Sequence, residues 1–187
     1  MIDPDHIDLE ISRVVVDPEA WEGRSEDEQV SNLHTMACMA AHHEWTAQFA
    51  FVFMLDEGFI DHVSMGVTDT TPADFFDIPI TEFVRFHGGK VLAVSIHLGA
   101  YAGEIQEDGT KVRKKESKYV ITISADNNIV ISRMERDVET NIPDNDGKWT
   151  TSLLDQVDMR MFGDITRMCR DIQQEIETQR KRRQPNG

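Results

Sequence analysis

The sequence predicts an α+β fold, in which an antiparallel sheet of about five strands packs with three helices. Residues 49–67 have the pattern of a hairpin, and residues 91–134 have that of a three-strand meander. In other segments, apolar side chains recur at three- and four-residue steps, as on one face of a helix. The expected order is (β)-α-β-β-α-β-β-β-α, with the first and last helices on one face of the sheet.

The first predicted elements are an edge strand and a long helix. Residues 6–16 alternate apolar and polar side chains, as a half-buried strand does, and Asp17-Pro18 ends the pattern. Ser25 and Glu28 have the spacing of a capping box, which predicts a helix from there to about residue 47. Small and aliphatic residues give this helix a broad apolar face that can lie close against a sheet: Val30, Leu33, Ala37, Ala40 and Ala41.

A hairpin and a second helix follow. Residues 49–55 are apolar on both faces, which predicts a central strand, and residues 59–67 alternate, which predicts cover on one face only. Thr71 and Pro72 have the residue types of an N-cap and a first helical position. We expect Pro79 to break or kink this helix.

The second half of the chain predicts the meander and the last helix. Strands are expected at 91–102, 119–124 and 129–134, with a polar loop and the basic run 111–118 between the first two. From about Thr150 the pattern is helical, and its apolar positions are Leu154, Val157, Met161, Ile165, Met168, Ile172 and Ile176. The order of elements alone is similar to that of roadblock-like and profilin-like domains, which serve mostly as dimerising or scaffolding modules.

The length of 187 residues fits one domain of ordinary size, which can bury a core without disulfides or metals. We expect an acidic strand and turn segment at 1–24, a single α+β domain at 25–179, and a basic, frayed tail at 180–187. Cys38 and Cys169 both lie in apolar helical patterns, which indicates buried thiols and a cytoplasmic location. The acidic N-terminus does not have the pattern of a secretory signal, and no apolar run predicts a membrane span.

The net charge of -15 is concentrated in the first half of the chain. Residues 1–90 carry eighteen acidic and four basic side chains, and residues 91–187 carry sixteen and fifteen. A negatively charged surface attracts positively charged partners and repels nucleic acid. We therefore expect a basic protein as the partner and do not expect nucleic acid. The expected contact residues are Asp3, Asp5, Asp8, Glu10, Asp17, Glu19 and Glu22. Another interpretation is that part of this acidity caps a helix, through Glu26, Asp27 and Glu28.

One candidate metal site lies on the first long helix. His34, Cys38 and His42 are spaced by four residues, and two imidazoles with a thiolate suit zinc. Three ligands along two turns of a helix cannot all reach one ion, so such a site would use an adjacent pair and a ligand from elsewhere. The simpler interpretation is that Cys38 packs in the core while the two histidines flank it.

A second candidate site is the polar face of the sheet. Alternation places histidines and hydroxyls on one side of several strands, which could converge as a general base and nucleophile. A solvated or dimer-facing surface has the same composition, so that interpretation stays open. The residues are His62, Ser64, Ser95, His97, Thr122, Ser124 and Ser132.

Two other patterns have simpler explanations. Residues 144–147 resemble a calcium loop, but Gly147 comes fourth rather than sixth, so we expect a type I turn. The basic runs 111–118 and 180–183 are expected to be solvated or to cap a helix. They could also meet the acidic half of a second copy.

Two functions of different classes remain. The first is a small acidic cytoplasmic interaction module that forms a homo-oligomer or binds a basic partner. One subclass of this function is an inhibitor that mimics nucleic acid. It requires no cofactor. The alternative is a metal-assisted hydrolase or related enzyme that uses His34, Cys38 and His42 together with His62 or His97, with zinc as its metal.

Overall fold

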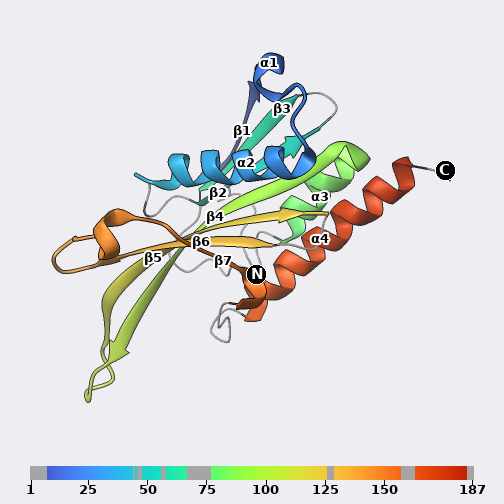
Figure 1. Ribbon diagram of the computed structural model, residues 1–187. Helices are drawn as coiled ribbons and strands as arrows, with labels where there is room; N and C mark the ends of the chain where they lie inside the picture. The colour runs from blue at the N-terminus through green and yellow to red at the C-terminus, as the bar shows by residue number, and fades with distance from the viewer. Residues whose placement is uncertain are drawn as a thin grey trace.

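In the computed structural model, a seven-stranded antiparallel sheet lies between helix α2 on one face and helices α3 and α4 on the other (Figure 1). The described residues are 8–43, 45, 48–55, 58–66, 77–125, 129–156 and 163–184. The α+β class is confirmed, and the predicted count of about five strands was too low. The elements are β1 (Asp8–Val15), α1 (Pro18–Trp21), α2 (Glu26–Ala41), β2 (Gln48–Met54), β3 (Phe59–Gly66), α3 (Asp77–His87), β4 (Val91–Ile105), β5 (Lys111–Ser124), β6 (Val130–Asp137), β7 (Thr150–Leu153) and α4 (Gly163–Arg183).

The strand order in the sheet is β1-β3-β2-β4-β5-β6-β7. The predicted hairpin is β2 and β3, the predicted meander is β4, β5 and β6, and β2 pairs with β4 to join them. The order differs from the prediction in two added elements, the one-turn helix α1 and the edge strand β7. Thr150 and Leu153 bound β7, so the expectation of a helix from Thr150 was wrong there. Four residues are too few to establish a period of two, and β-branched threonines favour a strand.

The first and last helices lie on opposite faces, which corrects their predicted placement on one face. On β2, Ala50 and Val52 belong to the core shared with α3 and α4, whereas Phe53 belongs to a core shared with Leu33 of α2. A strand that is apolar on both faces accepts a helix on either side, so its sequence does not tell which helix covers which face.

Side chains hold the start of α2 and the C-terminal part of α4 in place. Ser25 caps α2 as predicted, with its hydroxyl accepting from the amide of Glu28 and the Glu28 carboxylate accepting from the amide of Ser25. Helix α4 continues to Arg183, and Arg180 donates to the Glu26 carboxylate at 2.8 Å.

The predicted helix start at Thr71 and Pro72 lies outside the described residues. Pro79 lies in the first turn of α3, where proline is tolerated. No helix in the described part of the chain is long and apolar enough to cross a membrane.

An ion pair between a half-exposed arginine and a buried aspartate holds edge strand β1 to β3. Arg13 donates from Nε to Asp61 Oδ1 at 2.6 Å and from a terminal nitrogen to Oδ2 at 2.9 Å. The Asp61 side chain is 3% exposed and that of Arg13 is 46% exposed. His87 of α3 places Nε2 3.5 Å from the same carboxylate. The carboxylate therefore depends on Arg13 for charge balance.

We expect Arg13→Met to lower the free energy of unfolding by about 2 kcal/mol, because it leaves a buried carboxylate without its guanidinium. The half-exposed arginine keeps the loss below that of a fully buried pair. Urea unfolding measures it, with Arg24→Met on the exposed turn before α2 as the control. A loss equal to that of the control would contradict this role for the pair.

Candidate functional site

Helix α2 covers a layer of polar side chains on the central strands. Ser95 on β4 is the register partner of Thr122 on β5, and Ser132 on β6 is the partner of Val120. All three hydroxyl-bearing residues are at most 1% exposed. Alternation along the strands correctly grouped them, but the face is neither solvated nor open. It is buried beneath a helix, and we call it the polar layer.

His34 of α2 links the hydroxyls of the polar layer. Its Nδ1 lies 2.7 Å from Thr122 Oγ1 and its Nε2 lies 2.8 Å from Ser132 Oγ. Thr122 in turn bonds the Ser95 hydroxyl, and Ser132 lies 2.7 Å from the hydroxyl of Thr151 on β7. Burial lowers the pKa of His34, which favours a neutral ring that donates from one nitrogen and accepts at the other. The ring thus joins α2 to strands β5 and β6.

We expect His34→Ala to lower the free energy of unfolding by about 2 kcal/mol, because it removes two hydrogen bonds and leaves a small cavity. Each freed hydroxyl keeps one neighbour, which limits the loss. Chemical unfolding measures the change, and Thr35→Ala on the exposed side of α2 is the matched control. A stability equal to that of the control would mean that His34 does not hold the helix down.

The structure brings together two of the three predicted zinc ligands. Cys38 Sγ lies 3.7 Å from His34 Nε2, whereas His42 is exposed at the end of α2, with its ring 4.8 Å from that of His43. Burial raises the pKa of the Cys38 thiol to about 11, although a hydrogen bond with Ser132 opposes this. Within the described ranges, no three His, Cys, Asp or Glu side chains lie close enough together to hold a metal ion.

His97 is buried in the same face. It is 1% exposed, neither ring nitrogen has a hydrogen-bond partner among the described residues, and its ring lies 4.6 Å from that of Phe49. Burial lowers the pKa of His97 to about 4, and the positive charge of Lys118 adds to the effect. The ring is therefore neutral at physiological pH.

The other predicted histidine of this face does not join the polar layer. Strand β2 separates β3 from β4, so His62 stacks on Phe51 with ring centroids 4.7 Å apart. Ser64 lies in β3, but its side chain is outside the described residues, and Ser124 is buried at the end of β5. The two histidines therefore do not converge on one reaction centre.

Lys118 is a buried cation that the sequence did not single out. Its side chain is fully buried, and Nζ donates to the carbonyl of Ala41 at 2.6 Å and to that of His42. The ammonium also lies 4.1 Å from the ring centre of Trp45. It satisfies carbonyls at the C-terminal end of α2, where the helix dipole favours a cation. The basic run 111–118 was expected to be solvated or to cap a helix: Lys111 and residues 113–115 are exposed, whereas residues 116–118 are buried in β5 and Lys118 caps α2.

Strands β4 and β5 extend beyond the rest of the sheet as a two-stranded arm (Figure 1). Within the described chain, β2 accompanies β4 only to His97, and β6 accompanies β5 only to Lys115. Val138 adds one backbone bond to the Lys114 carbonyl at 3.0 Å. We define the arm as residues 103–114, beyond the paired Ala102 and Lys115.

The arm is shaped by two glycines and exposes both of its faces. Gly109 in the turn has a φ of 83°, and a Cβ at Gly103 would collide with the Val112 carbonyl where the pairing register shifts. Residues 101–111 and 113–115 are exposed, including Ile105 at 71%. At its base, the Arg113 guanidinium lies 4.1 Å from the ring centre of Tyr101. A ribbon of two strands with no covered face is marginally stable in water.

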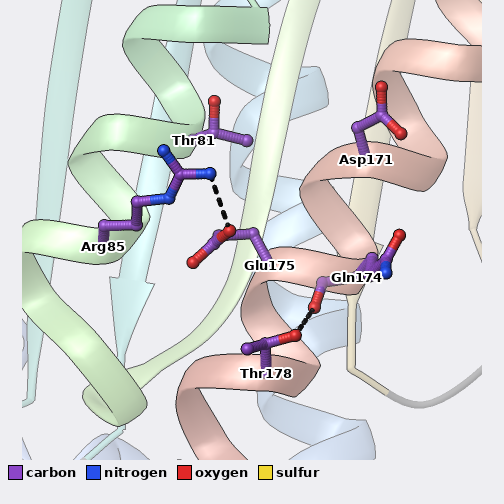
Figure 2. Close-up of a pocket in the computed structure, with 6 residues that line it drawn as sticks. All are labelled: Thr81, Arg85, Asp171, Gln174, Glu175 and Thr178. Carbon is purple, nitrogen blue, oxygen red and sulfur yellow. Dashed lines mark hydrogen bonds and ion pairs between the residues drawn. The ribbon is translucent and has the colours of Figure 1, made fainter.

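A polar hollow of about 370 Å³ lies between α3 and α4. Figure 2 shows Arg85 reaching across it to Glu175, at 3.1 Å, while Thr178 donates to the Gln174 carbonyl. Burial raises the pKa of Glu175, but hydrogen bonds from Gln179 and Arg85 outweigh it, so the net shift is downward. Arg85 is also paired with Glu82 at 2.6 Å. The hollow thus holds a satisfied link between two helices. Ligand pockets, by contrast, are mostly apolar.

The predicted acidic contact residues fall into three groups. Asp3 and Asp5 lie outside the described residues, and Asp8 and Glu10 lie in β1 with side chains that are not described. Asp17, Glu19 and Glu22 are exposed around α1. The Asp17 carboxylate accepts from the Glu19 amide at 3.0 Å, so it also caps this short helix. Contact with a basic partner stays a prediction.

Residues 144–147 form a 3₁₀ turn whose backbone differs from the expected type I turn. Asn145 has a φ of 52° and Asp146 a φ of 55°, in the left-handed region that asparagine and aspartate tolerate. Lys115 donates to Asp144 at 2.6 Å, so this turn braces the base of the arm.

No protein-family model, curated protein or solved structure matches the chain.

Proposed function

We propose that this protein is a protein–protein interaction module and that the arm is its binding element. The observation that carries the proposal is an exposed ribbon, residues 103–114, that projects from an otherwise well-packed sheet. Such a ribbon has no core of its own, and a partner would supply the missing cover. Open strand edges and exposed apolar side chains are also what a binding partner uses.

The polar groups inside the molecule favour this proposal over chemistry at the polar layer. Ser132 and Thr122 are buried, and the half-buried His34 has both ring nitrogens hydrogen-bonded to them, so the polar groups of this site are already engaged within the fold. The Cys38 thiol has a pKa of about 11 and is protonated at physiological pH, when it is a poor nucleophile and ligand. These groups contribute to holding α2 on the sheet.

Charge would add selectivity to binding. The chain carries a net charge of -15, and Asp17, Glu19 and Glu22 are exposed at the end of the molecule that bears α1. An acidic end of this kind attracts basic surfaces and repels acidic ones. The arm is the binding element in this proposal, and the acidic end orients the encounter.

A shortened-arm variant tests the proposal. Replacing residues 103–114 with Asn-Gly joins Ala102 to Lys115 through a two-residue hairpin turn and leaves the paired core strands unchanged. We expect its free energy of unfolding to stay within about 1 kcal/mol of the wild type, because the removed side chains are exposed.

The binding measurement compares tagged full-length and shortened-arm proteins purified side by side from the cells of origin. We expect proteins that accompany the full-length chain, including other copies of it, to be absent from the variant. Identical companions for both proteins, or none for either, would contradict the proposal.

A further inference from the structure

The arm carries both signs of charge in separate strands. The β4 side and the turn contribute Glu104, Glu107 and Asp108, and the β5 side contributes Lys111, Arg113 and Lys114. Asp108 accepts from the Thr110 amide at 2.8 Å and belongs to the turn, while Arg113 lies over Tyr101. Two carboxylates and two ammonium groups remain for contact with another molecule.

These four groups form no ion pair within the described chain, although Lys114 lies near enough to Asp137 for its charge to help lower the pKa of that carboxyl. No ion pair joins Glu104, Glu107, Lys111 or Lys114 to another described residue, and all four side chains are exposed. Within the arm, Glu104 is the register partner of Val112, and Ile105 is that of Lys111. The acidic and basic groups therefore do not face each other directly across the ribbon.

The arm is also the part of the molecule that two copies can bring together at least electrostatic cost. Its three acidic and three basic side chains cancel, so the chain's charge of -15 resides in the rest of the protein. Outside their arms, two copies of the protein therefore repel each other. The arm tip projects far from α1 and the acidic end (Figure 1), so a contact between two arms does not involve the acidic ends.

We propose that the arm binds the arm of a second copy, with the acidic side of each lying against the basic side of the other. This inference rests on the proposed function and names its partner. A twofold axis that runs along the two arms repeats each contact, so Glu104 and Glu107 of one copy meet Lys111 and Lys114 of the other, and the reverse. Ile105 of each copy is covered in the same contact. The interface is small, so the dimer is weak and depends on salt.

Light scattering of the purified full chain at low salt tests the inference. We expect the mass to rise with concentration from 21.4 kDa toward twice that value. Two variants reverse one sign each: K111E/K114E and E104K/E107K. Each should weaken self-association about tenfold or more, because like charges then face each other. An equal mixture of the two should restore it.

The mixture separates contacts between copies from contacts within one arm. Each variant keeps its altered arm, so only pairing between copies can restore association. Exposed lysines outside the arm give the control for K111E/K114E. The variant K148E/K181E makes the same change in net charge as K111E/K114E and should leave the dissociation constant within about twofold of the wild type. Circular dichroism verifies that each variant is folded.

Three results would overturn the inference: a wild-type protein that stays monomeric at every concentration, an unchanged dimer in K111E/K114E, or a mixture that fails to associate. If the purified chain is monomeric while the shortened-arm variant loses its companions from cells, the arm binds a different molecule. That outcome overturns arm pairing and leaves the proposed function standing.

Discussion

Lys118→Met is expected to lower the free energy of unfolding by about 4 kcal/mol, because two charge-assisted hydrogen bonds are lost and a buried carbonyl is left without a partner. The ammonium is fully buried and donates to Ala41 and His42 at the end of α2. Its contact with Trp45 is lost as well. Urea unfolding followed by tryptophan fluorescence measures the change.

Lys115→Met is the matched control, since Lys115 lies three residues away on the same strand. Its side chain is 47% exposed and its ion pair with Asp144 is on the surface, so the expected loss is below about 1 kcal/mol. Equal losses in the two variants would contradict the capping role of Lys118. The Lys118 variant should also raise the pKa of His97, because the nearby positive charge is gone.

The second large effect is a loss of stability in mild acid that arises from His97. Its pKa is about 4 in the folded protein and about 6.5 when unfolded, so the unfolded chain binds the proton first. Stability is therefore fully present above pH 6.5 and falls as the pH drops toward 4. One proton over this interval corresponds to roughly 3 kcal/mol.

His97→Phe isolates this contribution from that of the carboxylates. Phenylalanine keeps an aromatic ring beside Phe49 and has no nitrogen to protonate, so its stability should fall less between pH 7 and pH 4.5. The control Met39→Phe, at an exposed position on α2, should retain the wild-type slope. Parallel curves for the wild type and His97→Phe would mean that His97 does not set the acid sensitivity.

Local signals predicted the parts of the fold that depend on neighbours in sequence. The capping box of Ser25 and Glu28 starts α2, and the alternation of residues 59–66 located β3, although Ile60 and Val63 are buried on its two opposite faces rather than on one. The hairpin and the meander follow from short turns between such strands. What the alternation did not supply is the pairing of β2 with β4, which joins two units through backbone contacts distant in sequence.

The sequence predicted which residues form the polar layer, but not that helix α2 covers it and bonds to it. The strand pattern grouped Ser95, Thr122 and Ser132, and the helix pattern placed His34 beside Cys38. The contacts of His34 span 88 and 98 residues, and no local pattern encodes such a separation. Lys118 was missed for the same reason, because it lies in a run of charges that resembles a solvated surface. The apolar pair Tyr119 and Val120, directly after Lys118, was the available signal that the run enters the core.

The arm was missed because its residues have the composition of a loop. Gly103, Gly109 and the charges around them predicted an irregular connection, whereas the chain continues both strands through a register shift and a tight turn. Strands without a covered face lack the apolar alternation by which strands are recognised. The feature on which the proposed function rests is therefore the one that hydrophobic patterning describes least.

A photo-crosslinking amino acid at Ile105, in cells of origin, tests most directly whether the arm is the binding element. Met39 on the outer face of α2 is the matched control, because Ile105 is 71% exposed and Met39 is 70% exposed. We predict discrete adducts from position 105 on irradiation and none from position 39. No adduct from position 105, or the same adducts from both positions, would contradict the account.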